Sequence, residues 1–205
     1  MAKVRKPRSY SDYTLSDLRT LCGIDNSKAH FNLLTNTVNP SSLLVQTLSR
    51  NRIQPINTEK ARSELLITPV LIEWLSSNPQ RLQYFSGNTF NVDEKKSLKG
   101  RCDFLFTKHF SVDIVAPVVA MFEAKDDNVD NWYGQCGAEM FAARLFNEQA
   151  NQSYPIIYGA VTDGFEWVFL RLEDNMLFID IDRYYLNALP ELLGALQTII
   201  DFYKR

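Results

Sequence analysis

The spacing of apolar and polar positions changes along the chain, and these changes predict the order of its elements. From Thr58 to Leu75 apolar residues cover much of a helical surface, and Pro69 predicts a kink or break in that helix. Residues 82–92 and 102–107 have strand-like patterns, and residues 116–124 are apolar at nearly every position. We therefore expect a helix followed by three strands, the third covered on both faces.

The second half of the chain continues this alternation. Residues 132–147 have apolar positions at helical spacing, and Asp163-Gly164 is a hairpin signal between two strand-like segments. From Leu189 to Tyr203 the apolar residues recur at the intervals of a helix that lies on a sheet. The sequence thus predicts an α/β fold, in which a mixed β-sheet is flanked by helices on both faces.

Length and composition favour one such domain. Of 205 residues, 45% are hydrophobic and 22% charged, as is usual for globular proteins. We assign residues 58–205 to the α/β domain and residues 1–57 to an N-terminal extension with short helices. The extension starts with a basic arm that can touch phosphates or remain a solvated tail. This arm consists of Lys3, Arg5, Lys6 and Arg8.

The remaining composition excludes several classes of site. Cys22, Cys102 and Cys136 lie far apart, so we expect reduced thiols and neither a disulfide framework nor a zinc knuckle. With only His30 and His109 present, any metal should be held by oxygen atoms. The chain has no glycine-rich phosphate-binding motif, which sets aside dinucleotide-binding and P-loop enzymes.

Charge and hydropathy bear on partners and location. The chain has a net charge of −2 and so lacks the excess of basic residues that many nucleic-acid-binding proteins have. No apolar stretch reaches the roughly 20 residues that cross a bilayer, and the basic N-terminus is followed by polar residues rather than by a secretory signal. We expect no membrane partner and a cytoplasmic location.

The candidate chemistry lies where the most apolar strand ends. Glu123 and Lys125 are two residues apart and therefore project to the same face of that strand. Asp103 interrupts the apolar residues of the preceding strand, so Asp103 and Glu123 converge if the strands pair. Their carboxylates are the hard oxygen ligands that Mg²⁺ or Mn²⁺ prefers, and Lys125 would contact an attacking water or a scissile phosphate. A structural ion pair between Glu123 and Lys125 is the alternative.

These residues resemble a known family. Gly100-x-x-Asp103, a hydrophobic strand, Glu123-Ala124-Lys125 and a helix with Gln135 are similar to the PD-(D/E)XK nuclease superfamily, which has the restriction-endonuclease-like fold. Residues 161–172 also resemble the strand pair that follows this core in the N-terminal nuclease portion of type I restriction enzyme R subunits. The resemblance covers about residues 59–172, and Cys102 stands where the family motif has proline.

The resemblance implies a metal-dependent nuclease that hydrolyses phosphodiester bonds, with DNA favoured over RNA. It implies an acidic residue from the preceding helix, for which Glu64 is favoured over Glu73 as a third metal ligand beside Asp103 and Glu123. Glu64 and Glu73 are nine residues apart, about 180° around an ideal helix, so only one can face the sheet edge. The resemblance also implies that Gln135 helps to position the site or the nucleic acid.

Other interpretations stay open at this point. A non-catalytic nuclease-fold subunit of a DNA-processing or defence complex is the main alternative, because a fold does not guarantee activity. An enzyme acting on a small molecule is less favoured. Target recognition would come from a partner subunit, and a homodimer would supply the two sites needed to cut a duplex. Asp113 is a rival acid, and Trp132 and Tyr133 are either core residues or surfaces for base stacking.

Overall fold

The computed structural model describes residues 7–79 and 82–203. Of the predicted basic arm, Lys3, Arg5 and Lys6 lie outside the described residues. The α-helices are α1 (Leu15–Asp17), α2 (Ser42–Asn51), α3 (Glu59–Arg62), α4 (Thr68–Ser76), α5 (Tyr133–Gln149) and α6 (Leu189–Phe202). The strands are β1 (Asp25–Ala29), β2 (Gln83–Thr89), β3 (Arg101–Thr107), β4 (Val118–Ala124), β5 (Ile156–Thr162), β6 (Glu166–Glu173), β7 (Met176–Asp180) and β8 (Tyr184–Tyr185). Short 3₁₀ or π segments are η1 (Tyr10–Asp12), η2 (Leu18–Cys22), η3 (Ser63–Ile67), η4 (Val129–Trp132) and η5 (Leu186–Ala188).

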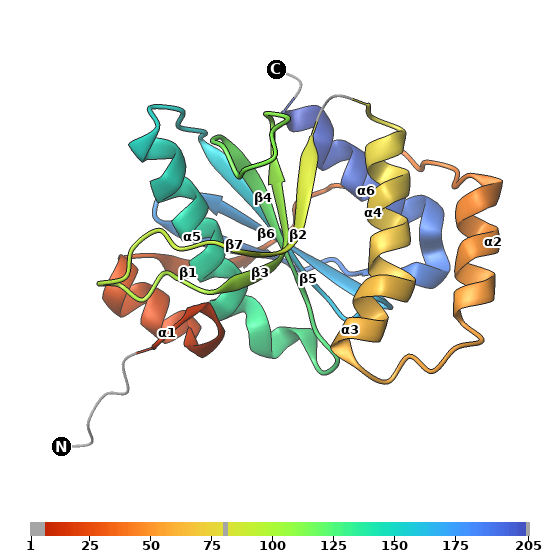
Figure 1. Cartoon of the computed structure of the whole chain (residues 1–205), viewed down its shortest axis with the longest axis horizontal. Helices are drawn as coiled ribbons and strands as arrows, with labels where there is room; N and C mark the ends of the chain where they lie inside the picture. Colours follow the sequence, from red (N-terminus) through yellow and green to blue (C-terminus); the bar gives the residue numbers. More distant parts are fainter. Residues whose placement is uncertain (1–6, 80–81, 204–205) are drawn as a thin grey trace.

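The strands of the described residues form one mixed sheet. Its order is β1-β7-β6-β5-β4-β3-β2, and β8 pairs with β6. The pairs β1–β7 and β4–β5 are parallel, and the other neighbours are antiparallel. Figure 1 shows α5 and α1 on one face of the sheet and α4 and α6 on the other, with α2 outside α4. The predicted α/β fold with a mixed sheet is confirmed.

The N-terminal segment contributes to the same sheet. Residues 25–29, which the sequence placed in an extension, form β1 and pair with β7 from Asp25 opposite Met176 to Ala29 opposite Asp180. The side chains of β1 are exposed or half-buried, which fits an edge strand. Because its sequence is polar except for Ala29, hydrophobic spacing alone could not identify it.

The predicted helix from Thr58 to Leu75 forms in three consecutive pieces. The Thr58 hydroxyl accepts a hydrogen bond from the Ala61 amide and begins α3. The π turn η3 follows, and α4 continues to Ser76. The change from π to α winding falls next to Pro69, the position at which the sequence predicts a kink or break.

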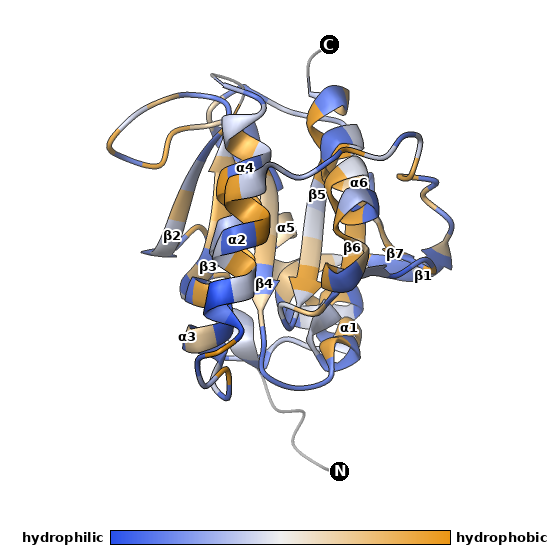
Figure 2. Cartoon of the chain, turned by 90° about the vertical axis from the view of Figure 1, so that its right-hand side faces the viewer, coloured by the Kyte–Doolittle hydropathy of each residue, from blue (hydrophilic) through white to orange (hydrophobic). Residues whose placement is uncertain are grey.

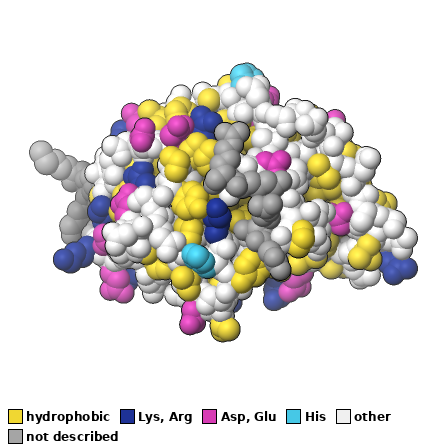
Figure 3. Space-filling view, turned by 90° about the horizontal axis from the view of Figure 1, so that it is seen from above, with side chains coloured by type: hydrophobic (Ala, Val, Ile, Leu, Met, Phe, Trp, Pro, Cys, Tyr) yellow, Lys and Arg dark blue, Asp and Glu magenta, His cyan; other side chains and the backbone are white. Residues whose placement is uncertain are grey.

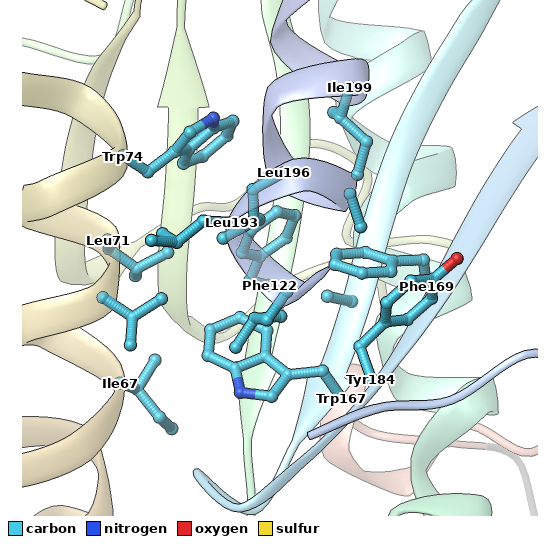
Figure 4. Close-up of a cluster of buried hydrophobic side chains, with 14 of the residues drawn as sticks. Ile67, Leu71, Trp74, Phe122, Trp167, Phe169, Tyr184, Leu193, Leu196 and Ile199 are labelled. Atoms are coloured by element: carbon cyan, nitrogen blue, oxygen red, sulfur yellow. The ribbon is translucent and has the colours of Figure 1, made fainter. Parts of the chain in front are cut away.

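The core consists of two buried clusters, one on each face of the sheet. The larger cluster joins the sheet to α4 and α6, and Figure 4 shows Phe122 of β4 at its centre, between Trp74 of α4 and Trp167 of β6. Hydropathy colouring in Figure 2 shows hydrophobic positions along α4 and α6 and on the strands behind them. All seven residues of β4 are buried, as the sequence predicted for a central strand.

A buried asparagine joins β4 to α5, and its removal provides a test of this packing. The Asn147 side chain accepts a hydrogen bond from the Val118 amide at 2.7 Å and donates one to the Val118 carbonyl at 2.6 Å. Asn147→Ala leaves both buried backbone groups without this partner and is expected to lower the free energy of unfolding by about 1–3 kcal/mol. Urea unfolding measures the loss. Gln149→Ala, at an exposed position of the same helix, should change stability by less than about 0.5 kcal/mol, and equal effects of the two changes would contradict this role.

Candidate active site

Strand pairing brings two of the predicted carboxylates together. In the antiparallel pair of β3 and β4, Phe104 lies opposite Phe122, so their neighbours Asp103 and Glu123 are adjacent at one end of the sheet. The Ala124 amide donates a hydrogen bond to Asp103 Oδ2 at 2.8 Å, which fixes the half-buried Asp103 side chain. Asp103 and Glu123 thus lie close together in the structure, as the sequence predicts.

Lys125 follows β4 and is held by several groups. Its Nζ atom donates a hydrogen bond to Glu123 Oε1 at 2.7 Å and lies 3.6 Å from Glu59 Oε2. The same ammonium group lies 4.4 Å from the ring centroid of Trp132, within the range of a cation–π interaction. The Lys125 amide donates to the carbonyl of Thr162, the last residue of β5. Only 6% of Lys125 is exposed, so its position is fixed by these contacts.

Helix α5 supplies a second layer of polar side chains behind Glu123. The Gln135 amide donates hydrogen bonds to Glu123 Oε1 and, at 3.2 Å, to Glu139 Oε1. All three residues are buried. Three of their oxygen atoms have no hydrogen-bond partner among the described residues: Glu123 Oε2, Gln135 Oε1 and Glu139 Oε2. The resemblance implied a positioning role for Gln135, and in the structure the Gln135 side chain is hydrogen-bonded to Glu123.

Burial and neighbouring charges shift the proton affinities of these groups. Burial raises the pKa of Glu123 well above its usual range, and the carboxylates of Glu139 and Asp103 raise it further. Burial also raises the pKa of Glu139 to about 8, against the hydrogen bond from Gln135. Burial lowers the pKa of Lys125, but the Glu123 charge and hydrogen bond and the Glu59 charge reverse this, so the net shift is upward. The Lys125 side chain is therefore a cation at neutral pH.

The helix carboxylate that reaches this cluster is Glu59. Glu64 is exposed and pairs with Lys60 at 3.2 Å. It lines the same cleft as Asp103, but among the described residues Glu59 is the helix acid that contacts Lys125. Glu73 lies elsewhere, because its carboxylate accepts hydrogen bonds from the amide and hydroxyl of Ser41 at the start of α2. Glu59 follows the Thr58 cap, and this was the signal in the sequence that could have drawn attention to it.

A cleft of about 400 Å³ opens beside Asp103. Its polar lining combines acidic and basic side chains from α3, η3 and β3, namely Glu59, Lys60, Glu64, Arg101 and Asp103. Charges of both signs are also interspersed at the opposite end of the molecule, where Figure 3 shows them among hydrophobic side chains. Of the charged residues that line the cleft, Asp103 and Glu64 are those that the sequence predicted for the site.

The donor atoms suit a divalent metal ion, although the cluster is small. Asp103 and Glu123 offer carboxylate oxygens, and Glu123 Oε2 is a buried acceptor without a partner among the described residues. Mg²⁺ is commonly held by one or two carboxylates together with waters and substrate phosphates. Within residues 7–79 and 82–203 no three His, Cys, Asp or Glu side chains are grouped so as to hold a metal by themselves.

The other residues considered from the sequence lie as follows. The Trp132 indole donates to Asp127 Oδ1 at 2.5 Å, and the buried Tyr133 donates its hydroxyl hydrogen to Asp130 at the same distance. Asp113 is exposed in the loop before β4, at the opposite end of that strand from Lys125. The three cysteines are free thiols, and only Cys22 among them is partly exposed.

Comparisons with known proteins add no further information on the site. No protein-family model matches the chain, and no curated protein matches its sequence. In the part of the chain that is described, no helix is both long and apolar enough to cross a membrane. The geometry of the site is therefore the basis for assigning a function.

Proposed function

We propose that the protein is a metal-dependent nuclease of the PD-(D/E)XK type that hydrolyses phosphodiester bonds, with DNA as the favoured substrate. One observation carries the proposal: Asp103, Glu123 and Lys125 meet at one end of two paired central strands. The elements that carry the sequence resemblance, β3, β4 and α5, are those that build this cluster. The proposal includes a restriction-endonuclease-like fold for this core.

Each side chain has a distinct part in the proposed reaction. Asp103 and Glu123 would hold Mg²⁺ or Mn²⁺, and a bound divalent ion would neutralise charge on the phosphate and lower the pKa of a water molecule. Lys125, as a fixed cation, would bind the scissile phosphate and stabilise its developing negative charge. Gln135 would hold the Glu123 carboxylate in place, and Glu59, which lines the cleft, would hold the Lys125 ammonium.

A second candidate function is a non-catalytic subunit with the same fold. It is favoured by one observation, that the Lys125 ammonium already has two carboxylate neighbours and an aromatic ring against it. Lys125, with its charge balanced by these carboxylates, could form a structural ion pair instead of binding a phosphate. A partner subunit or a second copy of the chain would supply target recognition under either function.

Cleavage by the purified protein tests the nuclease proposal. Plasmid, linear duplex, single-stranded DNA and RNA are each incubated with Mg²⁺, Mn²⁺ or EDTA. Cleavage is expected with a metal ion and not with EDTA. Asp103→Asn should lower the rate at least about tenfold, because a metal-binding charge is lost. The new side chain keeps an acceptor oxygen for the Ala124 amide, so the strand pairing should persist.

The matched control is Asp113→Asn, which removes the same charge from an exposed loop at the other end of the sheet. This variant should cleave at the wild-type rate. If folded wild-type protein at high concentration cleaves none of the four substrates with either metal ion, the second candidate function is supported instead.

A further inference from the structure

A second pocket has a lining that differs from that of the cleft beside Asp103. It has a volume of about 460 Å³. Two aromatic residues that line it, Phe165 and Tyr185, are 42% and 45% exposed. The remaining lining residues are Arg52, Ile56, Leu186 and Asn187. The pocket thus combines aromatic rings and aliphatic side chains with a guanidinium and an amide group.

Backbone hydrogen bonds join the two segments that carry these aromatic residues. β6 and β8 are antiparallel, with Glu166 opposite Tyr185. The Leu186 amide donates a hydrogen bond to the Phe165 carbonyl at 2.8 Å. Leu186 itself is buried and Ile56 is half-buried, so both provide a fixed apolar base. The aromatic groups are therefore exposed on a rigid support, which lowers the entropy cost of binding a flat ligand.

The helix α3 connects this pocket to the proposed active site. At its first residue, Glu59 reaches Lys125 at 3.6 Å. At its last residue, Arg62 pairs with Asp163 at 3.0 Å and lies 5.7 Å from the ring centroid of Phe165. The turn that contains Asp163 follows Thr162, whose carbonyl binds the Lys125 amide. One turn of helix and one hairpin turn thus separate the pocket from Lys125.

We infer that this pocket binds an unpaired nucleobase of the nucleic-acid strand whose phosphate lies at Lys125. This inference rests on the proposed function and deepens it by naming single-stranded or locally unpaired nucleic acid as the substrate class. Aromatic rings stack on any base, a guanidinium attracts the phosphates that flank it, and an amide can both donate to and accept from a base edge. Phe165, Tyr185, Arg52 and Asn187 supply these groups. In a duplex, pairing and stacking keep a base from entering such a pocket.

Equilibrium binding in EDTA tests the inference without any cleavage step. A labelled single-stranded oligothymidine and a duplex are titrated with the protein, and fluorescence anisotropy gives each dissociation constant. Phe165→Leu and Tyr185→Leu keep apolar bulk and remove one ring each. Each is expected to weaken single-strand binding about 5- to 150-fold, since stacking contributes roughly 1–3 kcal/mol per base. Tyr185→Phe keeps the ring and should bind within about twofold of wild type.

The control is Phe110→Leu, which removes another exposed ring, 59% exposed, from the loop at the opposite end of the sheet. It should leave both dissociation constants unchanged, and thermal unfolding verifies that every variant is folded. Wild-type protein that binds no single strand would overturn the inference, as would Phe165→Leu and Tyr185→Leu variants that bind like wild type. An equal loss of duplex binding would also overturn it.

These outcomes separate the inference from the proposed function. If the wild type cleaves but the two ring variants bind single strands normally, only the pocket assignment fails. If the wild type binds single strands through Phe165 and Tyr185 but never cleaves, the pocket assignment stands as that of a binding subunit and the nuclease proposal fails.

Discussion

Replacement of Lys125 by methionine is expected to lower metal-dependent cleavage by about 100- to 1,000-fold, the usual effect of removing one charge-stabilising donor from an active site. Methionine keeps the apolar length of the side chain and removes the ammonium group that contacts Glu123 and Glu59. Initial rates at saturating Mg²⁺ measure the effect. Cleavage within tenfold of the wild-type rate would remove Lys125 from the proposed chemistry.

The same change should also lower stability, because Glu123 loses its cationic neighbour while it remains buried. Rates are therefore compared below the unfolding temperature of each variant. The matched control is Lys28→Met, at an exposed position on the edge strand β1. This control removes a lysine charge from an edge strand that lies far from β3 and β4 in the order of the sheet. It should leave both cleavage and stability close to wild type.

Replacement of Phe122 by alanine is expected to lower the free energy of unfolding by about 3–5 kcal/mol. The Phe122 ring is fully buried, and its aromatic neighbours come from the three elements α4, β3 and β6. Its centroid lies 4.8 Å from that of Phe106, and 5.9 Å from that of Trp74 in a stacked arrangement. Alanine would leave a cavity that such rigid neighbours can fill only in part.

Urea unfolding of purified protein measures this loss. Phe122→Leu retains most of the apolar volume and should lose clearly less stability than Phe122→Ala. As a surface control, Phe110→Ala should change stability by less than about 0.5 kcal/mol, because the ring is 59% exposed. A loss below about 1 kcal/mol for Phe122→Ala would show that the cluster in Figure 4 does not hold β4 to α4 and α6.

The part of the site that follows from strand geometry could be predicted from the sequence. The apolar run at residues 116–122 identifies a central strand, and alternation then places Glu123 and Lys125 on one face. Asp103 follows from the assumption that adjacent strands pair, which the structure confirms. These inferences need only local periodicity and one pairing rule.

The parts that depend on longer-range packing could not be predicted in this way. β1 has no apolar pattern, and its pairing with β7 is set by packing over about 150 residues of intervening chain. The contact between Glu59 and Lys125 could not be predicted either, because the positions of Glu64 and Glu73 were compared on an ideal α-helix. The structure instead inserts a π turn between α3 and α4.

That π turn changes the direction in which side chains project from the two parts of the helix. A π turn accommodates one residue more than an α turn, so the residues before it are rotated by about 100° relative to those after it. The apolar face of α4 fixes one half of the helix against the sheet, and the extra residue in η3 sets the angle at which α3 leaves it. The length of this turn thus sets the direction in which Glu59 of α3 projects relative to α4. Deletion of one residue from this turn is therefore expected to rotate α3 by about 100° and to carry Glu59 away from Lys125.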